Sequence, residues 1–321
     1  MNVSSRRTAT RSRSASPHLA RLRKEGPMEP SLLPARRLRG YVAAQRAPAR
    51  SRGGGMGGKR DSRAAARVSR RRPAPGPRHS TAKAAMIYSV HQPHYLPYPG
   101  YLEKVAASDR FVFLEGVQYV RREYQNRNRV KGPDGPQWLT VPVRGEYRAR
   151  IDEMQVDDST GWRRKHIETL RRFYAHAPHL EELDRFAEVI GGTFASLAEL
   201  TIATTSFFLD RFGITTPRAK QASLEGLPEE PNHRIAEIGR RLGAEVYLAG
   251  AGGRNYMDLA AFREAGIEVR WFEHTPRPYR QLHGGFLPHL GAIDLLLNLG
   301  PGGFRELYGY EAAPGQREEQ A

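Results

Sequence analysis

Residues 89 to 104 read SVHQPHYLPYPGYLEK and place two histidines, three prolines and a glycine directly after a short apolar run. Proline fixes its own φ and restricts the residue before it, so this loop is predicted to be stiff. A stiff loop can present an imidazole in one position, where it can take a proton from a hydroxyl or an amine near neutral pH. We predict His91 as a general base, with Gln92, His94 and Tyr95 binding substrate. A buried structural histidine is the alternative.

The spacing His91-x-x-His94 is similar to the H-x-G-H signature of nucleotidylyl transferases, in which two histidines near a helix start bind nucleotide phosphates. In that signature the second histidine opens the helix. Here the helical pattern starts only at Tyr98. A nucleotidylyl-transferase-like activity is therefore a secondary hypothesis for this loop.

Three cations alternate with amide and apolar residues in the segment NRNRVK, which covers residues 126–131. Guanidinium forks and ammonium groups suit phosphate and carboxylate ligands. We predict that Asn126, Arg127 and Arg129 bind a small anionic substrate such as a nucleotide or a nucleotide sugar. The alternative is a solvated hairpin edge that its charges protect from further pairing.

A glycine-rich stretch, LAGAGGRNYMDL, separates a predicted strand from a predicted helix. Backbone N–H groups at such a junction can cradle an anion, so we predict that Gly250, Gly252 and Tyr256 bind substrate. The glycine spacing is not G-x-G-x-x-G, which argues against a dinucleotide, and the sequence names no other cofactor. A tight turn with close helix packing is the alternative.

Asp294 lies in the apolar helical stretch AIDLLLNLG, with Asn298 one turn later on the same face. A buried carboxylate is costly unless it is paired or used, so a structural hydrogen bond competes with a catalytic role that orients or polarises a partner. Gln281 can supply a hydrogen bond to a substrate hydroxyl. His166 and the histidines after it lack the three or four converging ligands of a metal site, so no metal site is predicted.

The elements around these residues predict an α/β fold. Strands are predicted at MIYSVH, RFVFLEGVQYV and WLTVPV. A short helix is predicted at YPGYLEKVAASD, and a hairpin turn at GPDGP. Residues 162–212 carry helical apolar periodicity, and Asn232 is the predicted cap of a later helix. A second β-α-β unit is predicted from AEVYLAG, NYMDLAAFREAG and IEVRWFEH. The segment HLGAIDLLLNLG is predicted to form the final helix. We predict a mainly parallel sheet with flanking helices and a helical insertion.

Charge divides the chain into two parts. Residues 1–85 contain 22 of its 51 Lys and Arg but only 3 of its 34 Asp and Glu, which leaves 29 bases and 31 acids for the remainder. The first part lacks apolar periodicity and is predicted to be a disordered Arg-rich tail. Three interpretations of residues 1–85 are open: a basic arm that binds nucleic acid or a membrane, a targeting peptide, or a stretch that is not part of the working protein. The folded part is not predicted to bind nucleic acid.

The predicted folded domain covers residues 86–311, followed by a disordered C-terminal tail at 312–321. Cysteine is absent, which excludes disulfides, thiolate nucleophiles and cysteine-based zinc or iron–sulfur sites. No apolar run approaches the ~20 residues that a membrane-spanning helix needs. The expectation is a soluble, cytoplasmic protein.

Five blocks of the sequence, in this order, resemble the WbqC-like protein family: residues 86–119, NRNRVK, WLTVPV, YLAGAGGRNYMD and IDLLLNLG. The resemblance covers essentially all of the predicted domain, and HQPHYLPYPGY is its most distinctive part. The site residues that it implies are His91, Gln92, Pro93, Tyr95, Pro97, Gly100, Asp109, Gln118, Asn126, Arg127, Gly250, Tyr256, Gln281 and Asp294.

The sequence departs from that family's pattern at three places. Tyr98 stands where the family commonly has Trp, and Tyr119 stands where it has Phe. Glu115 and Gly116 replace a pair of two acids or of Asp and Ser. A mechanism that needs paired carboxylates at this place is therefore not supported.

Members of the WbqC-like family are typically encoded among genes for O-antigen and other surface polysaccharides. The resemblance therefore implies a role in making or modifying an unusual sugar. Together with the predicted anion site, it leads to the hypothesis of a transferase-type enzyme that acts on a nucleotide-activated sugar. The alternative is a non-catalytic protein that binds the same ligand in polysaccharide assembly.

Overall fold

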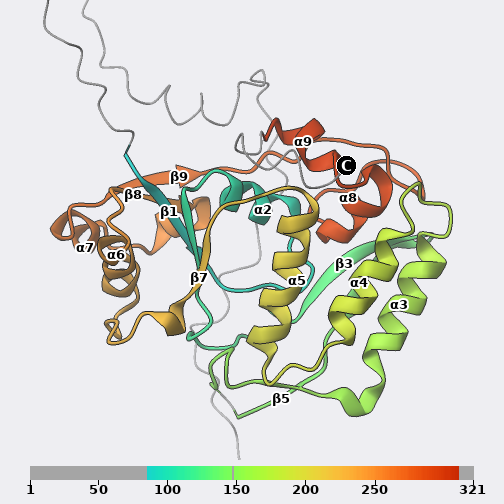
Figure 1. Cartoon of the computed structure of the whole chain (residues 1–321), viewed down its shortest axis with the longest axis horizontal. Helices are drawn as coiled ribbons and strands as arrows, with labels where there is room; N and C mark the ends of the chain where they lie inside the picture. Colours follow the sequence, from blue (N-terminus) through green and yellow to red (C-terminus); the bar gives the residue numbers. More distant parts are fainter. Residues whose placement is uncertain (1–84, 147, 311–321) are drawn as a thin grey trace, which may run out of the picture. The chain divides into compact units, whose positions relative to one another are not determined.

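The structure is a computed structural model that describes residues 85–146 and 148–310 (Figure 1). Its centre is a five-stranded sheet of order β7-β2-β1-β8-β9, in which all neighbours are parallel. The strands are β1 (Ile87–His91), β2 (Arg110–Phe113), β7 (Arg218–Lys220), β8 (Val246–Gly250) and β9 (Glu268–Phe272). The predicted α/β fold with a mainly parallel sheet is confirmed. The two predicted tails fall outside the described residues, except for residue 85.

Successive apolar side chains of the strands point to alternate faces of the sheet, so each face carries an apolar layer. Tyr88, Val90 and Val112 are buried in a cluster with side chains of α6 (Pro231–Arg241) and α7 (Leu259–Glu264). Phe111 and Phe113 belong to a second cluster that includes α2 (Pro99–Ala106) and α5 (Leu197–Arg211). Successive residues of a strand face opposite sides, so these two sets require helices on both faces. Figure 1 shows α6 and α7 together on one side of the sheet.

The predicted helical insertion is present as α3 (Trp162–Phe173), α4 (Glu182–Gly191) and α5. Their buried apolar residues extend the second cluster, which also takes in α8 (Ala292–Leu299). A further helix, α9 (Gly303–Tyr308), was not predicted, because GFRELY is too short to show helical periodicity. Phe304 of α9 packs on Phe212, with ring centroids 5.6 Å apart.

An antiparallel hairpin, β3 (Arg127–Gly132) and β4 (Gly135–Thr140), lies outside the main sheet. Its turn is the predicted GPDGP turn, in which Gly132 pairs with Gly135. Gly135 has a φ of 110°, a conformation that side-chain-bearing residues rarely adopt. A second small pair, β5 (Val143–Arg144) and β6 (Gln155–Val156), follows.

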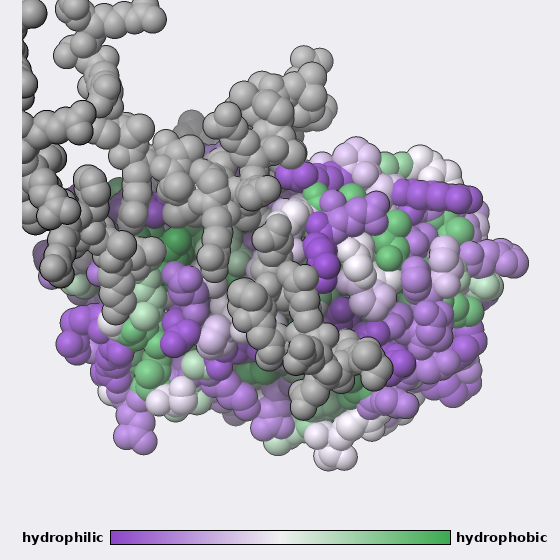
Figure 2. Space-filling model, turned by 45° about the horizontal axis from the view of Figure 1, so that its top comes forward, coloured by the Kyte–Doolittle hydropathy of each residue, from purple (hydrophilic) through white to green (hydrophobic). Residues whose placement is uncertain are grey.

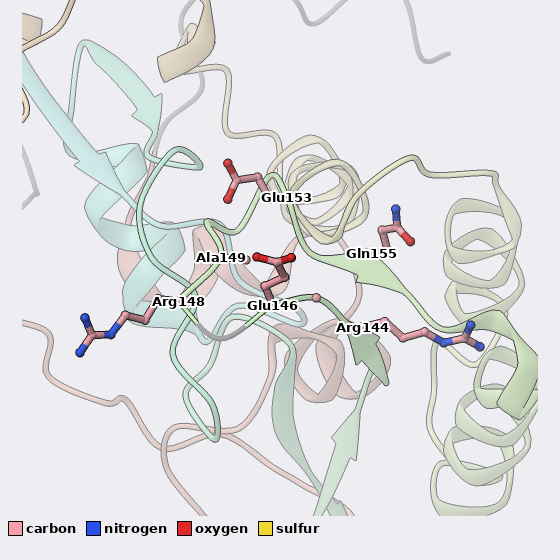
Figure 3. A pocket seen from close by; sticks show the side chains of 7 residues that line it. Arg144, Glu146, Arg148, Ala149, Glu153 and Gln155 are labelled. Carbon is pink, nitrogen blue, oxygen red and sulfur yellow. The ribbon is translucent and has the colours of Figure 1, made fainter.

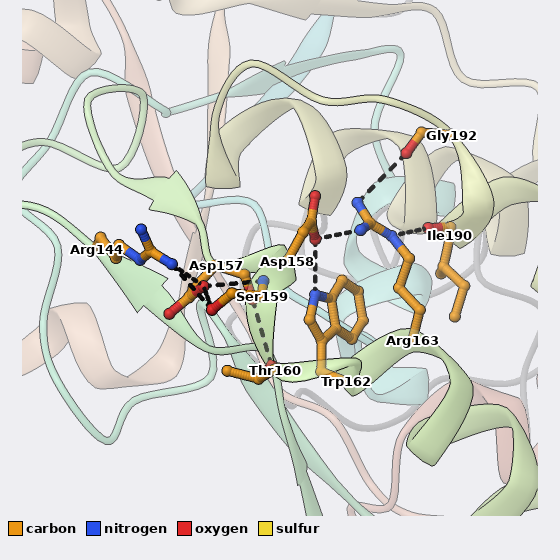
Figure 4. A network of polar contacts seen from close by, with 9 residues as sticks. All are labelled: Arg144, Asp157, Asp158, Ser159, Thr160, Trp162, Arg163, Ile190 and Gly192. Carbon is orange, nitrogen blue, oxygen red and sulfur yellow. Dashed lines mark hydrogen bonds and ion pairs between the residues drawn. The ribbon is translucent and has the colours of Figure 1, made fainter.

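A polar network ties the end of β6 to the start of α3 (Figure 4). Asp157 accepts hydrogen bonds from the backbone N–H and the hydroxyl of Ser159, and pairs with Arg144. Asp158 accepts from Trp162 Nε1 at 3.0 Å and pairs with Arg163, which also donates to the carbonyl oxygen of Ile190 in α4. These contacts anchor the helical insertion to the β5–β6 pair.

The predicted cap of α6 is wrong. The helix begins at Pro231, and Glu230 is the capping residue, with its carboxylate accepting from the His233 N–H at 2.7 Å. The Asn232 side chain instead donates to the same carboxylate. Proline favours the first helical position, because no helical partner is available there for an N–H group. This preference shifts the start one residue ahead of Asn232.

The order of strands creates a switch point at β1. From β1 the chain passes through α2 to β2 on one side, whereas β8 pairs with β1 on the other side. In open α/β sheets, ligands bind at the carboxyl ends of the strands beside such a point. His91 and Gly250 are the last residues of β1 and β8 and therefore lie at this edge.

None of the described helices is long and apolar enough to cross a membrane. On the face shown in Figure 2, hydrophilic side chains cover most of the visible surface of the described residues, and apolar side chains are scattered among them.

Candidate functional site

His91 lies at the carboxyl edge of the sheet, beside two other aromatic rings. Its ring centroid is 4.8 Å from that of His94 and 4.6 Å from that of Tyr101. Its Nδ1 is 3.0 Å from the carbonyl oxygen of Gln92, so Nδ1 carries the proton and the neutral ring presents Nε2 as an acceptor. Burial, and then the charges of Lys104 and His94, hold the pKa of His91 well below its usual range. The ring is therefore neutral at pH 7.

Lys104 was not among the predicted site residues, yet it lies against both histidines. It is 5% exposed, and its ammonium group donates to the carbonyl oxygen of Val90 at 2.9 Å. Burial lowers the pKa of Lys104 to about 7. Burial and the charge of Lys104 together lower the pKa of His94 to about 3. A lysine on the buried face of the helix PGYLEKVA is the signal that could have identified it.

Seven buried side-chain polar atoms of the described residues lack a hydrogen-bond partner, and four of them lie on residues of this region: His94 Nδ1, Tyr101 Oη, Arg127 Nε and Arg129 Nε. Asn126 Oδ1 also lacks a partner, but Asn126 precedes Arg127, so its side chain points to the opposite face of the strand, where its amide donates to the Val141 carbonyl oxygen. A buried polar atom without a partner costs about 1–3 kcal/mol, so folded proteins keep few of them. Such a concentration is expected where ligand atoms complete the hydrogen bonds.

The two arginines flank an exposed aromatic ring. Arg127 and Arg129 lie on the same face of β3, because residues two apart in a strand point the same way. Trp138 of β4 pairs with Arg129 in the hairpin and is 40% exposed. The guanidinium carbons of Arg127 and Arg129 are 4.1 Å and 5.8 Å from its ring centroid. This face can therefore offer both positive charge and a stacking surface.

Tyrosines connect the arginine face with the histidines. The Tyr124 ring is 5.9 Å from that of Trp138 and 6.0 Å from that of His94. Burial, Glu103 and Tyr124 raise the pKa of Tyr98, which indicates that Tyr98 also lies near Tyr124. We call this group the β1-loop site, and its members are His91, His94, Tyr98, Tyr101, Lys104, Tyr124, Arg127, Arg129 and Trp138.

A histidine and a carboxylate border the site and were not predicted. His274 follows β9, and its Nδ1 is 2.6 Å from Glu103 Oε2 in α2. Its ring packs 5.6 Å from Tyr98 and 6.0 Å from His289, by ring centroids. The available signal was position: His274 is the last residue of the predicted strand IEVRWFEH and thus lies at the edge where ligands bind.

The glycine loop after β8 differs from the prediction. Residues Ala251–Asn255 form a 3₁₀ turn, and α7 begins only at Leu259, where the Asp258 carboxylate accepts from the Ala260 N–H. The glycines therefore do not present the amides of the α7 N-terminus, and a carboxylate already occupies that end. Gly250 and Gly252 have open space where a side chain would be, whereas Gly253 packs against Met257 and Trp271. Tyr256 is exposed.

Asp294 lies in a closed hydrogen-bond network in the core. It is 0% exposed and accepts from the hydroxyls of Tyr174 and Tyr279, both at 2.6 Å. Burial raises its pKa, and the two hydroxyls and Lys131 act in the opposite direction. Lys131 is itself buried and donates to Gln281 Oε1 at 3.2 Å. The arrangement matches the structural alternative for Asp294, and it places Gln281 in the same network.

Other predicted residues lie away from the β1-loop site. Asp109 accepts from the Ile87 N–H at 2.8 Å, at the amino ends of β1 and β2 and thus at the opposite edge from His91. Gln118 forms an isolated bridge with Arg150 in the loop after β2. A residue that precedes a parallel strand lies at that strand's amino end, which explains the position of Asp109.

Two more predicted residues serve the packing of the loop. The Tyr95 hydroxyl is 2.9 Å from His166 Nδ1, inside the core of the helical insertion, and His166 is buried there. Burial lowers the pKa of His166 to about 4. Gln92 Oε1 accepts from Gln125 Nε2 at 2.7 Å, which fixes the loop before β3 to the β1 loop.

Two hollows of the described surface lie away from the β1-loop site. One of about 590 Å³ is lined by residues that include Arg144, Glu146, Glu153 and Gln155 (Figure 3). Another, of about 560 Å³, lies beside Glu115. We place the candidate site at the β1 loop instead, because the buried atoms without partners and the groups with shifted pKa values gather there. Within residues 85–146 and 148–310, no three acidic or histidine side chains are grouped to hold a metal.

A model of the WbqC-like protein family matches residues 92–306. The chain belongs to the WbqC-like protein family. It is 33% identical over 217 residues to Uncharacterized protein Rv1507c of Mycobacterium tuberculosis, an alignment that covers 66% of this chain and 93% of that protein. No solved structure matches the chain. The predicted family is confirmed, and the matched residues lie inside the predicted domain.

The structure shows where two of the residues that depart from the WbqC-like pattern lie. The Tyr98 ring packs beside those of His274 and His289 in the β1-loop region, so a residue that differs from the family pattern borders the site. Glu115 accepts from the backbone N–H groups of Gln221 and Ala222, at 3.1 Å and 2.8 Å. Its single carboxylate therefore holds the turn after β7 in place.

Proposed function

We propose that this WbqC-like protein is a transferase-type enzyme that binds an anionic donor, such as a nucleotide or a nucleotide sugar, at the β1-loop site. The reaction would make or modify a sugar of a surface polysaccharide, as the resemblance to the family implies. The observation that carries the proposal is the group of four buried polar atoms without partners, on His94, Tyr101, Arg127 and Arg129. Two of these four are guanidinium nitrogens, and guanidinium is suited to phosphate.

The residues divide into an anion side and a reacting side. On the anion side, Arg127 and Arg129 would bind the phosphates, and Trp138 would stack on a ring of the donor. On the reacting side, neutral His91 would contact the acceptor through Nε2, beside Lys104. Gly250 borders the reacting side, since it ends the strand next to β1.

A binding screen of the full chain tests the anion side. Calorimetry and thermal shift against nucleotides, nucleotide sugars and coenzyme A thioesters should yield a ligand whose affinity Arg127→Ala weakens by roughly 10- to 100-fold, as expected for lost charge-assisted hydrogen bonds. Arg164→Ala is the matched control, because Arg164 is exposed and makes only an i, i+4 ion pair with Glu168. It should leave the affinity unchanged.

His91→Ala separates an enzyme from a binder. An enzyme in which His91 contacts and orients the acceptor should lose roughly 10²-fold or more in rate with little change in donor affinity. A protein that binds and releases the same ligand without turnover would change only in affinity, which would support the scaffolding alternative. If Arg127→Ala and Arg164→Ala had equal effects, the ligand would not bind at the β1-loop site.

A further inference from the structure

Glu103 and His274 form a carboxylate–imidazole pair that the roles given above do not use. Glu103 Oε2 and His274 Nδ1 are 2.6 Å apart, the short distance of a charge-assisted hydrogen bond. The two side chains are 11% and 8% exposed, so water competes little for this bond. A carboxylate can only accept, so Nδ1 donates in this pair, and whenever the ring carries one proton its lone pair lies on Nε2.

The Nε2 atom of His274 is available to a ligand. Among the described residues it makes no hydrogen bond, and it is not one of the fully buried polar atoms without a partner, so this atom keeps some of the 8% of the side chain that is exposed. The ring is held in place by Tyr98, His289 and Tyr308, with centroids 5.6, 6.0 and 5.8 Å away. The lone pair is therefore aimed by packing as well as by the carboxylate.

Gly100 of α2 makes room for this ring. A Cβ atom at Gly100 would overlap both the His274 ring and the Tyr98 ring. The distinctive loop HQPHYLPYPGY thus contains, as its second-to-last residue, the glycine that allows His274 to approach α2. The loop that carries His91 and the imidazole after β9 are parts of one arrangement.

The other imidazoles of the region lack such a partner. His91 donates to a backbone carbonyl, and Nδ1 of His94 has no hydrogen-bond partner in the part of the chain that the structure describes. Burial also makes both rings weak bases, because it lowers the pKa of each. His289 is exposed and makes no bond to a carboxylate among the described residues. In this region only His274 combines an accessible Nε2 with a carboxylate at Nδ1.

We propose that His274 is the catalytic proton acceptor of the reaction and that Glu103 is its positioning residue. The inference rests on the proposed function. Nε2 takes the proton of the acceptor's hydroxyl or amine while that oxygen or nitrogen forms a bond to the electrophilic carbon of the nucleotide-activated donor. The bond from this carbon to the phosphate oxygen breaks, and the nucleoside diphosphate leaves with its electron pair. The imidazolium then passes its proton to water.

Diethyl pyrocarbonate tests the pair without a substrate, since it acylates unprotonated, accessible imidazole nitrogens. In the full chain, peptide mapping should show His274 modified at least as fast as the exposed His176, although the His274 side chain is nearly buried. Glu103→Gln should slow the acylation of His274 by about tenfold. A glutamine amide can donate to Nδ1, which would hold the tautomer whose proton lies on Nε2. The rate at His176 is the internal control.

Two results would overturn the inference: slow modification of His274 in the unaltered protein, or an unchanged rate in Glu103→Gln. The first needs no variant, so a folding defect cannot hide it. Nitrogen NMR of the unaltered protein gives a second readout, which should show the His274 proton on Nδ1 and the lone pair on Nε2.

Turnover completes the test once the binding screen has supplied a donor. His274→Gln should lower kcat by roughly 10²- to 10⁴-fold and leave the dissociation constant of the donor unchanged. Donor binding with normal turnover in His274→Gln would reject the role of His274 and keep the proposed function. Absence of any donor in the screen would reject the proposed function, and the acylation result would still decide whether the pair exists.

Discussion

At the scale of single residues, the most unusual group is Lys104, because its pKa of about 7 lies far below that of a solvated lysine. Its pKa in the unfolded chain is the ordinary one, so between pH 7 and about 10 the unfolded state binds more protons than the folded state. Stability therefore rises with pH across this window. Buried tyrosines such as Tyr101, whose pKa burial raises, act in the opposite direction only above about pH 10.

The first prediction concerns the pH dependence of stability. Urea unfolding of the wild-type chain should show a free energy of unfolding that is about 2–3 kcal/mol higher at pH 9.5 than at pH 7, through Lys104. Lys104→Met should remove this rise. Lys165→Met is the matched control, since Lys165 also donates to a backbone carbonyl but is exposed. A rise that persists in Lys104→Met would show that another group causes it.

The second prediction separates the two interpretations of Asp294. If its carboxylate only accepts from Tyr174 and Tyr279, then Asp294→Asn should lower the free energy of unfolding by about 1–3 kcal/mol, because one hydroxyl loses its acceptor. Donor affinity in the binding screen should be unchanged. Full stability combined with lost turnover would instead support the catalytic role predicted from the sequence. Urea titration and calorimetry on the same sample provide both values.

At the scale of elements, close packing of α6 against β1 depends on a missing side chain. A Cβ at Gly239 in α6 would overlap the Tyr88 ring of β1, whose hydroxyl donates to the Ile235 carbonyl oxygen at 2.8 Å. Gly191, the last residue of α4, has open space where its Cβ atom would be. The two helical glycines therefore allow one substitution to be compared in two environments.

Gly239→Ala should destabilise the protein by about 1–3 kcal/mol, because overpacking displaces Tyr88. Gly191→Ala should be neutral or stabilise by up to about 1 kcal/mol, because alanine is the better helix former and meets no neighbour. Thermal or urea unfolding of the two variants checks this third prediction. Equal and favourable effects would mean that α6 does not pack on Tyr88 as described.

Apolar periodicity was sufficient to predict the larger elements. Strands such as Ile87–His91 and the three helices after Trp162 carry clear patterns, because burial of one face determines them. Short elements escaped prediction: β7 has three residues, and its pairing with β2 is set by the fold rather than by its own sequence. Capping by Glu230 depended on one local hydrogen bond that composition does not reveal.

The candidate site was only partly predictable for a different reason. His91, His94, Arg127 and Arg129 lie in short segments with distinctive composition, and local sequence was enough to select them. His274 and Glu103 are far apart in the chain and become a pair only when β9 and α2 come together. Asp294 drew attention as a carboxylate in an apolar helix, but its partners, Tyr174 and Tyr279, come from other segments.

At the scale of the whole molecule, charge is distributed unevenly along the chain. Among the described residues, the apolar clusters begin at Met86, whose carbonyl oxygen accepts from the Val246 N–H at 3.1 Å. The segment from Met86 carries 29 bases and 31 acids, whereas the excess of cations lies before it. Folding and polyanion binding are therefore expected to be separable.

The fourth prediction is that residues 86–321 alone unfold within about 2 °C of the full chain, which corresponds to less than 1 kcal/mol for a domain of this size. The fragment should also show no binding to duplex DNA at 0.15 M salt, since its charges nearly balance. Calorimetry and fluorescence anisotropy measure the two properties. Salt-dependent DNA binding by the fragment would place a nucleic-acid surface on the folded domain.

The position of β1 in the middle of the sheet has a consequence for synthesis on the ribosome. β1 is made early and gains β2 on one side soon afterwards, but its other neighbour, β8, starts only at Val246. For most of translation, one edge of an apolar strand stays unpaired, and such an edge can pair with other chains. We therefore expect the nascent chain to bind ribosome-associated chaperones until β8 has been synthesised and can pair with β1.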